Sequence, residues 1–336
     1  MHSIAPRRVL ALAGLFTALA LLGCSSSSDA GSGGSGGTGG SAGAGGDGGS
    51  AGGAGGAGGF DPLEGIGAVE LIDDSFVFTE GPAWREADGT LLFSDIPINK
   101  IYELASPDEV SVFREDSNNS NGLRFDPDGL LLAAEHLSRS VSRTLENGTV
   151  ETVASEYEGA RLNSPNDIAV RSDGTIYFTD PPYGITEPDR ELDFNGVFRV
   201  DPAGELTAEW EGAPSTRPNG LVLSPDETLL YVADTVENQV AVFDVAADGS
   251  LSGRRVFLES VSAPDGMAID SAGNLFVTTT DGIAVYAPDA SSFGLIDIPD
   301  DGNPANCAFG DADARTLYIT ARQALYRVRL ANPGLY

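Results

Sequence analysis

Histidine and cysteine are scarce in this chain of 336 residues, which has two of each. Beyond residue 60 only His136 and Cys307 remain. Structural zinc sites are normally built from several histidines and cysteines, so a site of that kind is disfavoured there. The other cysteine, Cys24, ends a predicted secretion signal and is expected to carry a lipid, as described below, which leaves Cys307 without a partner. A disulfide framework is therefore excluded.

Basic residues are also few, because 19 Lys and Arg stand against 50 Asp and Glu, for a formal net charge of -31 at pH 7. Phosphate backbones bind to basic patches that release counterions, so nucleic acid is not an expected partner. The acidity favours solubility and raises the local concentration of cations, but it does not locate a site. Sustained helical periodicity is absent after residue 60, which argues against a helical fold.

The one long apolar run, Val9–Leu22, follows Arg7 and Arg8 and leads to Gly23-Cys24. About 14 residues are too few for a membrane span of roughly 20, so residues 1–24 are predicted to be a secretion signal. The small residue before Cys24 resembles a bacterial lipobox, which predicts cleavage there and a lipid on Cys24. The alternative is an ordinary cleavage site with an incidental cysteine. Serine at position 25 favours anchoring of the protein to the outer membrane, on its periplasmic or its outer side. The lipid is expected to be its only contact with the membrane.

The rest of the chain divides into a tether and one domain. Residues 25–59 are almost purely Gly, Ser and Ala and cannot bury a core, so they are predicted to be a disordered linker. Residues 60–336 suffice for one large all-β domain, which is expected to be a monomer.

Internal repeats run through this domain. Turns such as Asp88-Gly89, Asp128-Gly129 and Asp173-Gly174 separate β-branched and aromatic stretches that predict strands. Aligning the turns gives a first row of polar residues spaced 41, 45, 53, 46 and 41 positions apart: Glu80, Asn121, Asn166, Asn219, Asp265 and Asn306. A second row lies 14 or 15 residues further on: Asp95, Glu135, Asp180, Asp234, Thr279 and Thr320. This period predicts a six-bladed β-propeller whose last blade is closed by the segment 68–72.

Rotational pseudo-symmetry gathers the first row around one channel. Its two carboxylates, Glu80 and Asp265, and its amides are oxygen ligands, and calcium takes about 6 to 8 of these in tolerant geometry. We therefore expect one divalent cation, Ca²⁺, with Mg²⁺, Mn²⁺ or Zn²⁺ as alternatives. Asn and Asp before glycine also favour turns, which is the plainer interpretation of any single position. Glutamate is not a turn former, so Glu80 favours the ligand role.

Several strings match one family. They are Phe78-Thr79-Glu80-Gly81-Pro82-Ala83-Trp84, Leu162-Asn163-Ser164-Pro165-Asn166-Asp167, Phe178-Thr179-Asp180-Pro181-Pro182-Tyr183-Gly184, Pro218-Asn219-Gly220-Leu221 and Pro264-Asp265-Gly266-Met267. Together they resemble the SMP-30/gluconolactonase family across essentially the whole domain. The resemblance implies a six-bladed propeller with one catalytic divalent metal that hydrolyses gluconolactone, other lactones or phosphotriesters. It implies four metal ligands here: Glu80, Asn166, Asn219 and Asp265.

The resemblance also suggests roles around the metal. Asp265 is expected to be the general base in opening a sugar lactone, with Glu80 mainly a ligand. Substrate-binding or supporting roles are predicted for five residues: Asn121, His136, Asp167, Asp180 and Tyr183. His136 is equally compatible with a structural role. Animal members carry arginine where this chain has Ser164, so the substrate stays open.

Two rival functions also stay open. One is a non-catalytic propeller that binds a protein or a glycan, and the other is a phosphotriesterase that uses the same site.

Overall fold

The computed structural model describes residues 61–106, 108–300 and 302–336. The predicted signal segment 1–24 with its lipid site at Cys24, and the predicted linker 25–59, lie outside these residues. Within them, no helix combines the length and the apolar character that crossing a membrane requires.

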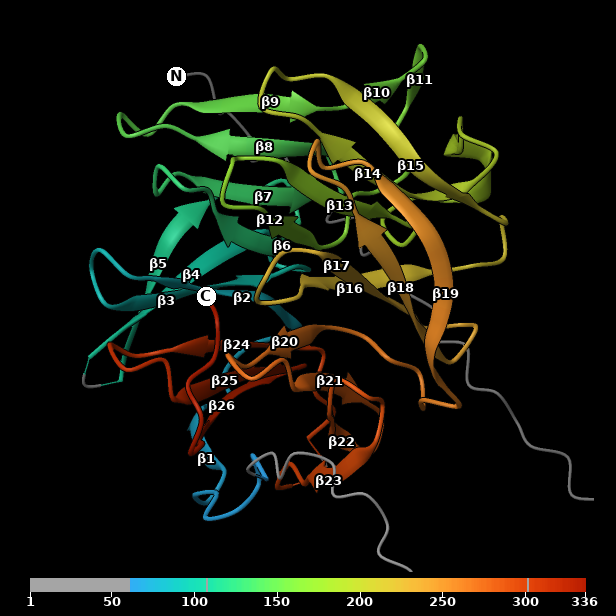
Figure 1. The fold of residues 1–336 in the computed structure, drawn as a ribbon. Coiled ribbons are helices and arrows are strands. Elements are labelled where there is room, and N and C mark those ends of the chain that lie inside the picture. Colours follow the sequence, from blue (N-terminus) through green and yellow to red (C-terminus); the bar gives the residue numbers. More distant parts are fainter. Residues whose placement is uncertain (1–60, 107, 301) are drawn as a thin grey trace, which may run out of the picture. The chain divides into compact units, whose positions relative to one another are not determined.

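Six four-stranded antiparallel sheets form the blades of a propeller (Figure 1). Blade 1 consists of β2 (Thr79–Arg85), β3 (Thr90–Asp95), β4 (Lys100–Ala105) and β5 (Glu109–Glu115). Blade 2 consists of β6 (Ser120–Phe125), β7 (Leu131–Glu135), β8 (Ser140–Thr144) and β9 (Val150–Ala154). Blade 3 consists of β12 (Ile168–Val170), β13 (Ile176–Asp180), β14 (Asn195–Val200) and β15 (Leu206–Gly212). Blade 4 consists of β16 (Pro218–Leu223), β17 (Leu229–Asp234), β18 (Gln239–Val245) and β19 (Leu251–Glu259). Blade 5 consists of β20 (Met267–Ile269), β21 (Leu275–Thr279), β22 (Gly282–Tyr286) and β23 (Ser292–Ile296). Blade 6 consists of β24 (Asn306–Gly310), β25 (Thr316–Ala321), β26 (Ala324–Arg329) and β1 (Glu70–Asp73). The predicted all-β, six-bladed propeller is confirmed.

Two short elements interrupt the blade pattern. A small hairpin of β10 (Glu156–Tyr157) and β11 (Ala160–Arg161) lies between blades 2 and 3. The 3-10 helix η1 (Glu187–Asp189) lies in the connection from β13 to β14. Both insertions fall in connections at the end of the blades where the first strands begin.

Aspartate and glycine shape the turns between first and second strands. In blade 2, Asp126 Oδ1 accepts hydrogen bonds from the backbone N–H groups of Asp128 (3.1 Å) and Leu130 (2.9 Å). Gly129 follows with a φ of 77°, a left-handed conformation in which a side chain is unfavourable. The Asp-Gly pairs therefore end one strand and direct the chain back along the next.

The apolar core lies between neighbouring blades. One cluster joins blades 2 and 3 and includes Leu132, Phe178 and Phe198, and the rings of the two phenylalanines stack at 5.2 Å. Between blades 1 and 6, Trp84 stacks on Tyr318 at 5.8 Å. Because both faces of most blades are covered, strands such as β13 are buried throughout.

The first strands approach one another so closely around the channel that a side chain would not fit. A Cβ atom on Gly220 would lie 2.4 Å from the carbonyl oxygen of Asp265, and one on Gly266 would lie 2.1 Å from the side chain of Asn306. The N–H of Gly220 donates to that same Asp265 carbonyl at 3.0 Å. Glycine after the polar residue thus lets the strands bond directly and draws the first-row side chains together.

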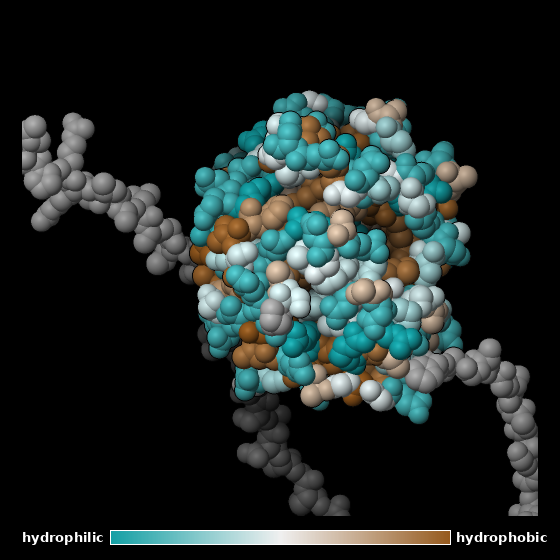
Figure 2. All heavy atoms as spheres, turned by 90° about the vertical axis from the view of Figure 1, so that its left-hand side faces the viewer, coloured by the Kyte–Doolittle hydropathy of each residue, from teal (hydrophilic) through white to brown (hydrophobic). Residues whose placement is uncertain are grey.

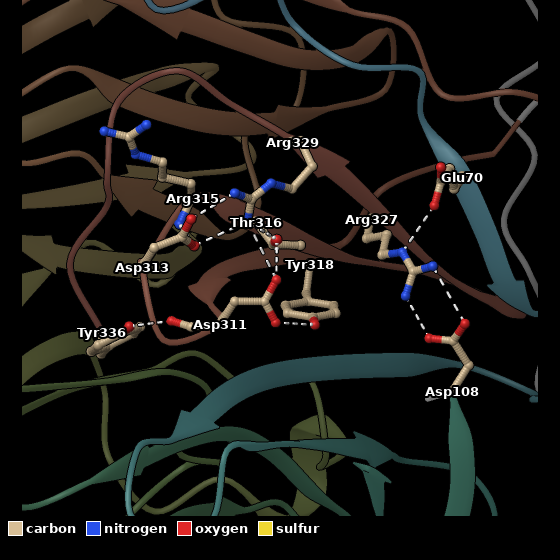
Figure 3. A network of polar contacts seen from close by, with 10 residues as sticks. All are labelled: Glu70, Asp108, Asp311, Asp313, Arg315, Thr316, Tyr318, Arg327, Arg329 and Tyr336. Atoms are coloured by element: carbon tan, nitrogen blue, oxygen red, sulfur yellow. Dashed lines mark hydrogen bonds and ion pairs between the residues drawn. The ribbon is translucent and has the colours of Figure 1, made fainter. Parts of the chain in front are cut away.

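The ring is closed by β1, which pairs antiparallel with β26. Arg327 of β26 reaches two partners: its Nε donates to Glu70 of β1 at 3.0 Å, and its guanidinium bonds Asp108 in blade 1 (Figure 3). Beside it, Arg329 pairs with Asp311 and Asp313. The predicted closing segment 68–72 is confirmed in its role, and the observed strand is Glu70–Asp73.

Candidate functional site

The six first-row residues lie together at one end of the channel. Glu80, Asn121, Asn219 and Asn306 lie at or near the start of their innermost strands, whereas Asn166 and Asp265 lie just before β12 and β20. Five of the six are buried, with at most 6% of their surface exposed, and Asp265 is partly exposed. The ring therefore presents side chains from all six blades to a small volume that solvent reaches beside Asp265.

A chain of hydrogen bonds connects the amides of three successive blades. Asn121 Nδ2 donates to Asn166 Oδ1 at 2.6 Å, and Asn166 Nδ2 donates to Asn219 Oδ1. Asn219 Nδ2 in turn donates to Thr235 Oγ1 at 3.0 Å. Each amide nitrogen is thereby occupied by its neighbour, which fixes the rotation of Asn166 and Asn219. Asn121 orients Asn166 through this chain.

The two carboxylates of the ring disfavour each other's charge. Burial raises the pKa of Glu80 well above its ordinary value, and the negative charge of Asp265 adds to that rise. Burial also raises the pKa of Asp265 to about 7, although the charge of Arg322 opposes the rise. A pair of acids that resists ionisation in this way would be stabilised in its charged form by a cation between them.

The chemistry of this donor set fits a hard cation. Within the described residues, no three His, Cys, Asp or Glu side chains come together as a metal-binding group, so the ring combines two carboxylates with amides. Carboxylate and amide oxygens are the ligands that calcium and magnesium take, and the positions not filled by protein go to water or substrate. Glu80, Asn166, Asn219 and Asp265 would hold such an ion.

Asp167 takes the place that glycine has in four other blades, directly after the ring residue. Its Oδ2 accepts from Asn306 Nδ2 at 3.5 Å, and its Oδ1 accepts from the N–H of Ile168 at 2.9 Å. Burial raises its pKa to about 6. Its position beneath the ring makes it a support for Asn306.

His136 lies in the wall of the channel. Its Nε2 is 3.4 Å from Asn121 Nδ2, and burial lowers the pKa of the imidazole to about 4. The imidazole is therefore neutral near pH 7, and its unprotonated Nε2 can accept a hydrogen bond from the amide N–H of Asn121. Gly184 packs against it so closely that a Cβ there would lie 2.5 Å from His136 Cβ.

Asp180 ends β13 and Tyr183 lies in the loop that follows, and the two face different partners. The buried carboxylate of Asp180 accepts hydrogen bonds from the N–H groups of Asn163 and Ser164, both at 2.7 Å. It therefore fixes the segment that leads to Asn166, and it acts on the ring through that segment. Tyr183 is 43% exposed, and its hydroxyl is 3.5 Å from Asn219 Nδ2, at the mouth of the site.

Other second-row residues support the loops in the same manner. Asp95 accepts from the N–H groups of Val77 and Phe78, and Asp234 accepts from that of Arg217. The row lies at the channel end as expected, but these aspartates bind backbone there.

Sequence reasoning missed two residues at the mouth. Thr235 accepts from Asn219 and donates to the carbonyl of Pro264 at 2.8 Å, and Arg322 acts on the charge of Asp265. Both lie one or two positions beyond the second row, as His136 does. That register is the signal that could have identified them.

Comparison with known proteins finds relatives of this chain in one family. A family model described as the SMP-30/gluconolactonase/LRE-like region matches residues 78–323. The chain is 36% identical over 300 residues to the gluconolactonase of Zymomonas mobilis, which covers 79% of this chain and 82% of that protein. It is 25% identical over 256 residues to a pentonolactonase of Haloferax volcanii, at 74% and 83% coverage. A solved gluconolactonase from Xanthomonas campestris has the same fold, with a TM-score of 0.74, 33% identity and coverage of 80% and 91%.

Proposed function

Because this chain belongs to the SMP-30/gluconolactonase/LRE-like family, we propose that it opens a sugar lactone at the channel mouth with one bound divalent cation, calcium. It is a lactone-hydrolysing hydrolase, in keeping with relatives named gluconolactonase and pentonolactonase. The observation that supports the finer proposal is the convergence of Glu80 and Asp265 with the hydrogen-bonded amides of Asn166 and Asn219.

The four side chains have different proposed roles because their surroundings differ. A calcium ion held by these side chains would polarise the lactone carbonyl and would lower the pKa of a coordinated water. Glu80 is buried and would hold the ion, while the amide oxygens of Asn166 and Asn219 are pre-oriented by their own hydrogen bonds. Asp265 is partly exposed, so its carboxylate can reach a water from the solvent side and take its proton as general base.

Residues around the ring are proposed to place the substrate. Tyr183 stands at the mouth, where its hydroxyl can bind a sugar hydroxyl. Neutral His136 lies deeper and keeps Asn121 in position. Asp180 holds the loop that carries Asn166. These residues are proposed to bind or position the substrate and take no part in proton transfer from the water.

Metal removal tests the proposal. The full chain is treated with EDTA, dialysed and assayed on glucono-1,5-lactone with added Ca²⁺, Mg²⁺, Mn²⁺ or Zn²⁺. We expect activity to be lost and to be restored best by Ca²⁺. Activity that survives exhaustive chelation would contradict metal catalysis. A phosphotriester assayed in parallel separates lactonase from phosphotriesterase chemistry.

Site variants test the residue assignment. Asp265→Asn and Glu80→Gln should each lower kcat/KM on the lactone by more than tenfold. Asp128→Asn, in an exposed turn at the other end of the channel, is the control and should keep full activity. Unchanged turnover in both site variants would remove the assignment.

We also propose that the protein is exported and anchored to the outer membrane by a lipid on Cys24, with residues 25–59 as the tether. Mass spectrometry of the mature N-terminal peptide should find an acylated cysteine. Cys24→Ser should release the protein from the membrane fraction, and retention of that variant would contradict the proposal.

A further inference from the structure

Arg322 is fixed beside the ring by its backbone. It lies in the tight turn between β25 and β26, with a φ of 56°. Its carbonyl oxygen accepts the N–H of Thr79, the residue that precedes Glu80. The turn of blade 6 is thus joined to the first strand of blade 1 at the edge of the site.

The Arg322 guanidinium is held by an aromatic ring. Its Cζ lies 4.4 Å from the centroid of Phe78, which keeps the side chain extended beside the mouth. Among the described residues, no carboxylate forms an ion pair with it, although the protein carries 50 acidic residues. Arg327 and Arg329, on the strand that follows, are both paired. Within the described residues, the donors of Arg322 therefore have no acidic partner.

Arg322 lies at the end of the channel that carries the ring. Its backbone bridge to Thr79 places it one residue from Glu80, and its side chain contacts Phe78, two residues before Glu80. Arg322 also lines a depression of about 510 Å³ over blade 6, between the β25–β26 turn and β1. The depression is bordered by Val77, Asn303 and Tyr326, and Arg322 is its only basic residue among those described. Its volume is in the range of small-molecule sites.

The surface around this depression offers little else that would attract an anion. Asp74 and Asp300 border it, and the whole chain carries a formal charge of -31. The opposite end of the channel, shown in Figure 2, is also mainly hydrophilic, with apolar residues in small separate patches. A negatively charged ligand would be repelled at long range and would depend on a local cation to be held.

We propose that Arg322 is a specificity-determining residue that binds an anionic group of the substrate, a carboxylate, phosphate or sulfonate remote from the lactone carbonyl. This inference rests on the proposed lactonase function. A guanidinium forms paired hydrogen bonds to such groups, and the Phe78 ring holds it ready to do so. The preferred substrate class is thus an acidic sugar lactone.

The chain supplies a matched control. Arg254 is also exposed and also lies over an aromatic ring, with its Cζ 4.6 Å from the centroid of Trp210. It lies on β19, the outermost strand of blade 4. Arg254→Gln therefore removes the same charge and the same kind of contact as Arg322→Gln, away from the channel.

The test compares three lactones on the calcium-loaded full chain: neutral glucono-1,5-lactone, its 6-phosphorylated form and a glucaric acid lactone. We expect Arg322→Gln to lower kcat/KM for the two anionic lactones about 10- to 100-fold, mainly through KM, because charged hydrogen bonds are lost. The neutral lactone should lose much less, so the ratio of kcat/KM between the anionic and the neutral lactones should fall, which a loss of carbonyl activation or of folding would not produce. Arg322→Lys should restore part of the loss, and Arg254→Gln should behave as wild type. The phosphate and carboxylate substrates show which anion fits best.

A binding measurement separates this inference from the proposed function. Calorimetry with gluconate and 6-phosphogluconate needs no turnover, and only the phosphorylated acid should bind more weakly to Arg322→Gln. Equal losses on neutral and anionic lactones, or a wild type without preference for the anionic ones, would overturn the role of Arg322. Failure of wild type on every lactone would instead overturn the proposed function.

Discussion

Replacing Asp265 with asparagine should make the metal-free protein more stable at alkaline pH while it removes the response to calcium. Burial raises the pKa of Asp265 from 3.8 to about 7. The folded protein therefore binds more protons than the unfolded chain between these two values, and stability is lost as the pH rises through that window. Asparagine has a similar shape and does not ionise, so the variant avoids this loss.

The magnitude follows from the difference in pKa. About three pKa units correspond to about 4 kcal/mol at pH 8, where the carboxyl is charged in both states, and to less than half of that at about pH 5. These figures are upper limits because Asp265 is partly exposed. The variant also removes the negative charge that raises the pKa of Glu80, which adds to the gain.

Urea unfolding provides the assay, with wild type and Asp265→Asn compared in EDTA and in excess calcium. In EDTA the variant should be more stable than wild type at pH 8, and the difference between the two proteins should be smaller at pH 5. Calcium at about 100 times its Kd should add about 3 kcal/mol to wild type and little to the variant. A variant that is less stable than wild type at pH 8 in EDTA, or equal calcium gains in both proteins, would refute the reasoning.

Four further variants probe the ring, one turn and the closure of the propeller. Glu80→Gln should abolish calcium-dependent protection from proteolysis, and intact protection would exclude Glu80 as a ligand. Gly220→Ala should lower the free energy of unfolding by about 3 kcal/mol or more, because its Cβ would stand 2.4 Å from the Asp265 carbonyl. Gly129→Ala has open space around it and should cost only the strain of its φ of 77°, about 1 to 2 kcal/mol, so equal losses from both would contradict the crowding argument. Arg327→Gln at the closing seam should cost less than about 1 kcal/mol by thermal unfolding, and a larger loss would show that the exposed ion pairs dominate closure.

The repeat register predicted the propeller because each blade needs a similar length of chain and begins with the same polar-residue turn. It also predicted that Glu80 and Asp265 share one channel, since pseudo-symmetry fixes the direction of a first-row side chain. The closing strand was assigned to 68–72, but its bounds depend on pairing with β26, and Glu70–Asp73 is observed. Strand bounds of this kind are set by a distant partner that local sequence does not reveal.

The finer arrangement of the site could not be predicted. The direction of the Asn121–Asn166–Asn219 hydrogen bonds depends on side-chain rotation within the finished ring. Arg322 follows the second row as His136 does, but the length of this connection varies among blades, from residues 322–323 in blade 6 to 181–194 in blade 3, so its approach to Asp265 is seen only in the structure. Second-row Asp180 falls in register, yet only the structure shows that it binds backbone N–H groups.

The pairing of β1 with β26 also sets the order of events during folding. Glu70 and Arg327 lie 257 positions apart, so the last blade cannot be assembled until nearly all of this chain has left the ribosome. Until then β1 has no partner strand, and another chain could pair with it. Contacts between such distant segments form slowly, so the newly made protein should pass through an incomplete, aggregation-prone propeller. The lifetime of that intermediate should govern the yield of folded protein.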